Sequence, residues 1–218
     1  MIRNRIIYFL SVLVIMTSCV TENENNVDAI DTTKRVFPSL APTVPDSEYA
    51  IVKSLFSKYH VSLSNLKVFR FSRTPNYNIR CYQYYFDSCY KDFAYEIFTN
   101  DLVFSFYEDV NYFRISGVPV DKIQINLFPK VSIAEASNLF YNELKKDWWY
   151  KDSLVSYSRE GFGAELGIYD LNTGFSNLQH NYVLAWRLTV NNGFKYPRGY
   201  IRADKLELIN YSNGIIIN

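Results

Sequence analysis

Residues 132–146 read SIAEASNLFYNELKK, and this stretch predicts an amphipathic helix with both of its ends defined. Ser132 and Glu135 have the spacing of a capping box, in which each side chain accepts a hydrogen bond from the backbone N–H of the other residue. Apolar residues recur at helical spacing, and Lys145 and Lys146 place positive charge where the helix dipole favours it. The helix has one apolar stripe, which we expect a sheet to cover.

The chain around this helix shows the same order of elements twice. A first helix is predicted from Asp46, as its N-cap, to about His60. Strand-like segments are predicted at 67–72, 79–86, 93–99, 102–108 and 112–116, with turns at Asp87-Ser88 and Asn100-Asp101, and again at 154–158, 164–169, 182–191, 199–202 and 206–211. This order predicts an α+β fold of two tandem modules, residues 46–128 and 129–218, each with one helix packed on an antiparallel sheet.

Composition agrees with a sheet-rich fold and argues against nucleic-acid binding. The chain has 218 residues, of which 19 are Tyr and 16 are Phe, and such aromatic residues favour half-buried strands. Its 23 basic and 22 acidic side chains give a net charge of +1. A nearly neutral chain lacks the excess of positive charge that nucleic-acid binding requires.

The N-terminus has the layout of a secretory signal. Arg3 and Arg5 precede an apolar run at 6–16, which is too short for a membrane span of about 20 residues. Met16-Thr17-Ser18-Cys19 then resembles the lipobox of bacterial lipoproteins, with Met in place of the usual Leu. The resemblance implies that residues 1–18 are a signal peptide and that Cys19 is acylated, with palmitate among its acyl chains, which would anchor the protein stably.

Residues 19–45 are predicted to form a flexible, lipidated tether. The segment after Cys19 is rich in acidic residues and asparagine and has no aromatic residue before Phe37, so it cannot bury enough surface to fold. Acidic residues close to a lipidated cysteine are similar to the surface-export signal of Bacteroidota lipoproteins. This resemblance implies an outer-membrane location with exposure at the cell surface.

The folded part resembles a pair of modules from thermolysin-type protease propeptides. PKVSIAEASNLF at 129–140, YVLAWRLTVNN at 182–192 and YIRADKLELI at 200–209 look like a PepSY module, with its Trp-Arg strand and closing hairpin. CYQYYFDSCYKDFAYEIFTNDLVFSF at 81–106 is similar to the preceding FTP module. The resemblance implies a PepSY/cystatin-like fold and a binding or inhibitory role. One departure is Arg202–Leu206, where the usual turn glycine is missing.

Catalytic motifs are absent from the sequence. It contains neither His-Glu-x-x-His nor Gly-x-Ser-x-Gly, and its two histidines, His60 and His180, have no ligands at metal-binding spacing. Carboxylates such as Glu108-Asp109, or Asp87 with Asp92, could serve glycoside hydrolysis if they came together, although solvated turn acids are the simpler interpretation. We therefore expect no enzyme, no cofactor and no metal.

Aromatic residues and cysteines supply the candidate sites. Trp148, Trp149 and Tyr150 follow the second helix and form either an exposed platform for sugars and partner side chains or a cap on the core. Tyr82 and Tyr84 belong to a tyrosine-rich hairpin that could present a recognition surface. Cys81 and Cys89 are candidates for a structural disulfide, and the spacing around the predicted turn leaves bridged and free thiols both open.

These features predict an envelope-anchored, non-enzymatic lipoprotein that binds a protein or peptide partner. Recognition would use an aromatic sheet face or strand addition at an open edge. A protease inhibitor and an accessory subunit of an outer-membrane system both fit this description. The competing interpretation is a surface lipoprotein that binds or hydrolyses carbohydrate.

Overall fold

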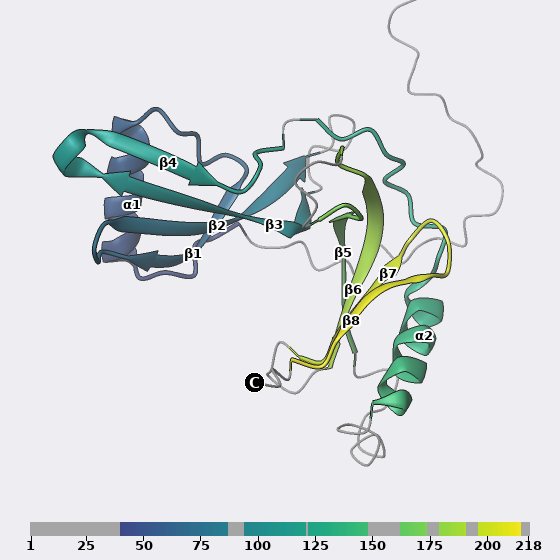
Figure 1. Cartoon of the computed structure of the whole chain (residues 1–218). Helices are drawn as coiled ribbons and strands as arrows, with labels where there is room; N and C mark the ends of the chain where they lie inside the picture. The colour runs from purple at the N-terminus through teal and green to yellow at the C-terminus, as the bar shows by residue number, and fades with distance from the viewer. Residues whose placement is uncertain are drawn as a thin grey trace, which may run out of the picture. The chain divides into compact units, whose positions relative to one another are not determined.

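A computed structural model describes residues 40–86, 94–120, 122–147, 162–173, 179–190 and 196–214. This part of the chain contains two α-helices and eight strands (Figure 1). They are α1 (Asp46–Lys58), β1 (Leu66–Ser72), β2 (Tyr77–Phe86), β3 (Ala94–Tyr107), β4 (Tyr112–Ser116), α2 (Ile133–Lys146), β5 (Phe162–Asp170), β6 (Tyr182–Val190), β7 (Arg198–Arg202) and β8 (Leu208–Ser212), with a 3-10 turn, η2, at Glu108–Val110. The predicted α+β class is confirmed.

The strands form one open, mostly antiparallel sheet. Its order is β1-β2-β3-β5-β6-β7-β8, and β4 pairs with another part of β3. The β3–β5 pair is parallel and consists of Glu96 opposite Gly167 and Ile97 opposite Ile168. Where the sequence predicts a separate sheet for each module, the structure has a continuous one, because β3 belongs to both halves.

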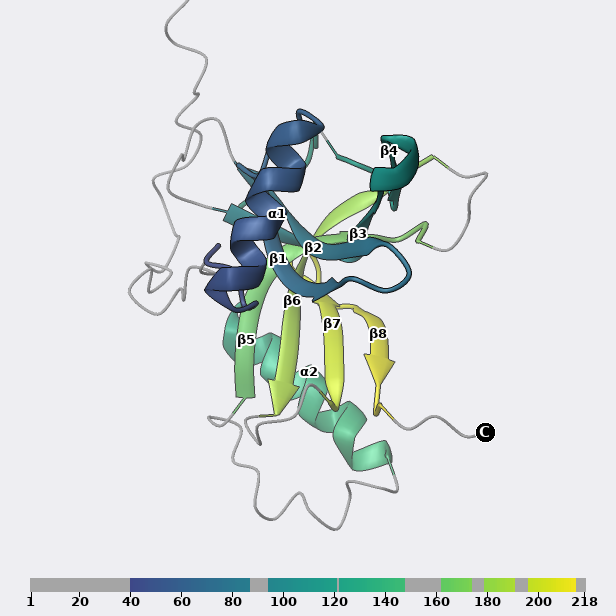
Figure 2. The same ribbon diagram turned by 90° about the vertical axis from the view of Figure 1, so that its left-hand side faces the viewer.

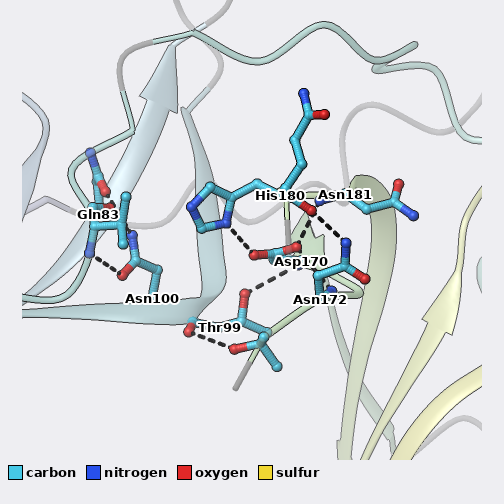
Figure 3. Close-up of polar contacts among 10 residues, drawn as sticks. Gln83, Thr99, Asn100, Asp170, Asn172, His180 and Asn181 are labelled. Atoms are coloured by element: carbon cyan, nitrogen blue, oxygen red, sulfur yellow. Dashed lines mark hydrogen bonds and ion pairs between the residues drawn. The ribbon is translucent and has the colours of Figure 1, made fainter. Parts of the chain in front are cut away.

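Strand β3 corrects one prediction from the sequence. The predicted turn at Asn100-Asp101 would divide it, but the 14 residues of Ala94–Tyr107 form a single strand. The turn-forming residues instead mark an irregularity in the β2–β3 pairing, where Tyr82 lies opposite Asp101 and Tyr84 lies opposite Glu96. The Asn100 amide contacts Gln83 there, donating to Oε1 at 3.3 Å (Figure 3). The Asn100 side chain therefore supplies a hydrogen bond where the β2–β3 pairing is interrupted.

Helix α1 packs on β1–β4 through a cluster of buried apolar side chains, which we call the α1 cluster (Figure 1). At its centre, the ring of Phe56 meets Phe104 edge-on, with 4.8 Å between centroids. The buried members are Val52, Leu55, Phe56, Leu66, Val68, Ile79, Cys81, Leu102, Phe104 and Phe106.

Helix α2 packs on β5–β8 through a second group of buried side chains, the α2 cluster, to which the helix contributes Phe140 and Leu144. In Figure 2 the helix lies behind these strands. A side chain at Gly199 would place its Cβ 2.6 Å from the Phe140 ring, so the glycine gives the helix room. Tyr95 and Ile97 of β3 also belong to this cluster. Residues 95 and 97 of β3 thus contact the α2 cluster, whereas residues 102, 104 and 106 belong to the α1 cluster.

The two helices begin differently. The capping box of α2 is confirmed, because Ser132 N–H donates to Glu135 Oε2 at 2.8 Å and Glu135 N–H donates to Ser132 Oγ at 3.2 Å. Helix α1 has Pro45 rather than the predicted Asp46 at its N-cap, with no side-chain cap. Asp46 lies in the first turn, where a negative charge suits the helix dipole.

The close approach of β3 and β5 gives the first testable prediction. A Cβ at Gly167 would lie 2.4 Å from Phe98 Cζ and 2.6 Å from the backbone oxygen of Glu96. Because that oxygen cannot move without disturbing the parallel pair, we expect Gly167→Ala to lower the free energy of unfolding by about 2–3 kcal/mol. Urea denaturation of the purified full chain measures this change in the free energy of unfolding.

The control is Ser116→Ala, at an exposed position of β4, which should change the free energy of unfolding by less than about 0.5 kcal/mol. Equal stability of the two variants would contradict the close contact between β3 and β5.

Candidate binding surface

The part of the sheet formed by β1–β4 has a second face, directed away from the α1 cluster. In antiparallel pairs, opposed residues point to the same side, so the strand register defines this face. A hydrogen bond of 2.7 Å from Ser105 Oγ to Asn78 Oδ1 confirms the assignment for one pair. None of its side chains is buried. We call it the exposed face: Lys67, Phe69, Arg70, Ser72, Asn78, Arg80, Tyr82, Asp101, Val103, Ser105, Tyr107, Tyr112, Arg114 and Ser116.

The exposed face is basic. Arg70 and Arg80 are direct cross-strand partners, and Arg114 and Lys67 lie on the same face. Within the described part of the chain, none of these four cations takes part in an ion pair. Among the residues of the face, Asp101 carries the one negative charge. The surface therefore favours anionic ligands.

Aromatic rings lie among these cations. Phe69 and Tyr82 are stacked, with 4.0 Å between centroids and 14° between ring planes, and Tyr107 lies 5.9 Å from Tyr112. Phe69 occupies a bulge in β1, which places its ring over its neighbour on β2. Tyr82 therefore lies at the surface where the sequence predicts a recognition site.

Tyr84 does not lie at this surface, which corrects the sequence interpretation. Its side chain is buried, and its hydroxyl donates to Glu96 Oε2 at 3.3 Å. Burial and the nearby Glu96 carboxylate raise the pKa of Tyr84 above its ordinary value. The alternation of buried and exposed side chains along β2 is interrupted here, because Gln83 and Tyr84 are both buried at the irregularity in the β2–β3 pairing. Tyr84 is a structural residue.

Strand β4 forms an edge beside the exposed face. In the described sheet it pairs with β3 alone. Apolar side chains in and next to this strand are solvent-exposed: Val110 by 66%, Tyr112 by 56%, Ile115 by 36% and Val118 by 46%. An edge strand with exposed apolar residues can accept an extended segment of another protein.

The other candidates from the sequence lie elsewhere. Cys19, Cys89, Trp148, Trp149 and Tyr150 are outside the described residues. Among the described residues, no helix has the length and hydropathy needed to cross a membrane.

Cys81 is a free thiol among the described residues, and its candidate partner Cys89 lies outside them, so the disulfide stays a prediction. The Cys81 side chain points into the α1 cluster and is fully buried. Burial, with a contribution from Asp101, raises the pKa of the Cys81 thiol to about 12. The thiol is therefore protonated at neutral pH and acts as a small apolar core residue.

Of the candidate carboxylates, the structure describes Glu108 and Asp109. Glu108 and Asp109 are exposed in η2, and Glu108 lies 3.8 Å from Lys58 Nζ. Asp87 and Asp92 lie outside the described residues. Among the described residues, no group of three metal-ligating side chains comes together.

A buried ion pair connects the two halves of the sheet, and the sequence analysis missed it. Arg187 donates to both carboxylate oxygens of Glu96, from Nη1 at 2.6 Å and from Nη2 at 3.1 Å, and Nε donates to Glu165 at 2.6 Å. The guanidinium also lies 4.4 Å from the centroid of the Phe98 ring. Burial opposes the charged form, but the two carboxylates raise the pKa of Arg187 above its ordinary value. The pair fixes β6 to β3 across β5.

A second polar group closes the connection between β5 and β6 (Figure 3). Asp170 Oδ2 lies 2.6 Å from His180 Nδ1, while Oδ1 accepts the N–H groups of Asn172 and Asn181 at 3.0 and 2.9 Å. The N–H of Asp170 donates to Thr99 Oγ1 at 3.1 Å, which ties the group to β3. Asp170 therefore accepts backbone hydrogen bonds at both ends of the connection between β5 and β6. None of the described hydroxyl or thiol groups hydrogen-bonds to His180. The arrangement is that of a structural anchor.

Comparisons with known proteins identify no family for the chain. No family model matches it, and no curated protein matches it. Among solved structures, it is similar to the Bacillus megaterium YpeB C-terminal domain, with 11% sequence identity and a TM-score of 0.37. The match covers 82% of this chain and 68% of that one. The described residues define the class as an α+β protein with one open sheet, two helices and an exposed basic face.

The ion pair gives a prediction about stability. Arg187 and Glu96 have side chains exposed by 16% and 9%, so removing one partner leaves a largely buried charge. We expect Arg187→Met to lower the free energy of unfolding by about 3–5 kcal/mol. Combining it with Glu96→Gln should cost less than the sum of the two single variants, because the double variant leaves no buried unpaired charge and only Glu165, with a side chain 55% exposed, loses its partner.

Urea denaturation of the full chain measures both effects. Lys205→Met removes a cation from the exposed pair with Glu207 and is expected to cost less than about 1 kcal/mol. If Arg187→Met is no more destabilising than this control, the buried pair does not stabilise the sheet.

Asp170 gives a prediction about pH. Burial opposes its ionisation, but His180 and the N–H groups of Asn181 and Asn172 hold the pKa of Asp170 below its ordinary value. The stability it contributes is therefore present above an unfolded-state pKa of about 3.9 and is lost as pH falls through the lower folded-state pKa. Asp170→Asn should lower the free energy of unfolding by about 1–2 kcal/mol at pH 5.

The difference between this variant and the unaltered protein should shrink when the same urea denaturation is repeated near pH 3. A difference that stays constant between pH 5 and pH 3 would show that the charge of Asp170 does not stabilise the fold.

Proposed function

We propose that this chain is a lipid-anchored, non-enzymatic protein of the bacterial cell envelope that binds a protein or peptide partner. The observation that carries the binding role is the exposed face of β1–β4 together with the apolar edge of β4. The sequence Met16-Thr17-Ser18-Cys19 supports the anchor, and the acidic segment after it supports export to the outer surface of the outer membrane. The tether of residues 19–45 would let the folded part reach a partner near the membrane.

The physical basis of binding is pairing at an unprotected strand. An edge strand offers backbone N–H and C=O groups to an extended segment, and natural sheets normally protect such edges with charges, proline or a covering element. Strand β4 has one charged residue, Arg114, and carries Tyr112 and Ile115 exposed beside it. A partner segment paired with β4 would bury these side chains and gain backbone hydrogen bonds.

The sequence resemblance to FTP and PepSY modules gives this role a wider context. We propose that α1 with β1–β4 and α2 with β5–β8 are two such modules that share the sheet through β3. Each has its own buried cluster around one helix, which supports this division. Modules of this type would inhibit a protease or serve as an accessory subunit of an outer-membrane system.

Chemical crosslinking in the native envelope, followed by capture of the full-length chain and mass spectrometry, tests the proposal. We expect one stoichiometric protein partner, and capture should fall in a Cys19→Ser version that lacks the anchor. A double variant, Val110→Asp with Tyr112→Asp, should reduce capture at least tenfold, because it places charge along the apolar edge of β4.

The matched control for this surface is Leu206→Asp, at a similarly exposed apolar position between β7 and β8. It should leave capture unchanged. If no partner is captured by anchored and well-expressed protein, partner binding is wrong. Glycan arrays with Trp149→Ala would then test the carbohydrate alternative, together with hydrolase assays.

A further inference from the structure

Arg70 and Arg80 form an unfavourable pair within the exposed face. As direct cross-strand partners they have Cβ atoms roughly 4.5–5.5 Å apart, and like charges in this arrangement destabilise a sheet. The next residues across the sheet from Arg80 are Val103 and Ser116, which are uncharged. Asp101 is a diagonal neighbour of Arg80 on β3, but no acid lies directly opposite either arginine in the described strands. Unfavourable local features of this kind are found where function requires them.

Other arginines of the described sheet differ from those of the exposed face. Arg187 is held by Glu96 and Glu165, and Arg202 donates to Asp204 from Nε at 2.8 Å. Arg70, Arg80 and Arg114 have no such partners among the described residues. Arg187 and Arg202 thus have carboxylate partners, whereas the arginines of the exposed face have none among the described residues.

The spacing of these arginines suits an extended ligand. Arg80 and Arg114 lie on strands separated by β3 and are offset by two residues along the strands. With strands about 4.8 Å apart and a rise of about 3.4 Å per residue, their Cα atoms are roughly 12 Å apart. Two side chains four residues apart on one side of an extended segment are separated by about 13 Å. An extended chain can therefore present an acid to each position.

The chemistry of the surface favours a peptide over other anions. Guanidinium groups bind carboxylates through two parallel hydrogen bonds, and the stacked Phe69 and Tyr82 rings provide apolar contact beside them. The chain as a whole is nearly neutral, so it lacks the broad positive field that drives binding to membranes or nucleic acids. The adjoining β4 edge offers backbone pairing, which a peptide can use and a lipid headgroup or polysaccharide cannot.

We infer that the exposed face binds an acidic, extended peptide segment of the partner protein, with its carboxylates held by Arg70, Arg80 and Arg114. This inference rests on the proposed function and specifies the chemistry of its partner. The arginines would provide charge recognition of this segment, while the edge of β4 would pair with a further segment of the same partner.

A direct binding measurement tests the inference with a defined probe. Fluorescence anisotropy of a labelled glutamate-rich 12-residue peptide is measured against the purified full chain. The triple variant Arg70→Glu, Arg80→Glu and Arg114→Glu should weaken probe binding at least tenfold. A control triple, Lys53→Glu, Lys146→Glu and Lys205→Glu, makes the same change in net charge at exposed positions elsewhere and should weaken binding less than threefold.

A second measurement separates binding from folding. Because Arg70 faces Arg80, Arg70→Ser should raise the urea concentration at the midpoint of unfolding while weakening probe binding. A lower midpoint would mean that Arg70 has a structural role, which would overturn the inference.

The remaining outcomes distinguish the inference from the proposed function. If the two triple variants weaken probe binding equally, the effect is one of net charge and the inference is wrong. If the arginine triple still captures the envelope partner while Val110→Asp with Tyr112→Asp does not, the inference is wrong and the proposed function stands. Tighter arginine-dependent binding to dextran sulfate or to phosphatidylglycerol vesicles than to the peptide would overturn the assignment of a peptide ligand.

Discussion

The ion pair between Arg187 and Glu96 is the interaction on which the continuous sheet depends. The parallel pairing of β3 with β5 consists of two residue pairs, which is a small contact for joining two halves of a sheet. Arg187 reaches across β5 from β6, holds Glu96 of β3 in a bidentate contact and also binds Glu165 of β5. Three neighbouring strands are therefore connected through one guanidinium. Asp170 adds a further link through Thr99, at the adjacent end of β5.

The same region explains how one strand can serve two helices. At the irregularity opposite Gln83, β3 changes its neighbours, and its side chains divide between the α1 and α2 clusters. Each cluster holds one helix. Because α1 occupies one face of β1–β4, the other face carries arginines and aromatic rings at the surface. The architecture that joins the halves thus also leaves one basic face of β1–β4 exposed.

Local features of the fold could be predicted from the sequence, and long-range features could not. The capping box of Ser132 and Glu135 marks the start of α2, and the 112–116 strand has the predicted bounds, because both depend on near neighbours. The Asn100-Asp101 signal was wrong as a turn, since tertiary pairing keeps β3 extended through it. Glu96 and Arg187 are 91 residues apart, so no local pattern indicates that they meet.

The candidate surface was predicted in part. A tyrosine-rich hairpin indicates a recognition face, and Tyr82 lies there, but Tyr84 is buried because the β2–β3 irregularity interrupts the alternation. The opposed arginines could not be recognised without the strand register, since Arg70 and Arg80 become neighbours only when β1 pairs with β2. A bulge at Phe69 sets that pairing, and bulges are poorly specified by single sequences.

Site-specific photo-crosslinking in the native envelope tests the central claim most directly. A photoreactive amino acid is placed at Tyr82 on the exposed face, at Tyr112 on β4, or at Lys53 on the exposed side of α1. Our account predicts that one protein partner is crosslinked from Tyr82 and Tyr112 and not from Lys53. Crosslinking of the partner from Lys53 alone would contradict the account, because it would place the contact on the helix and not on the exposed face.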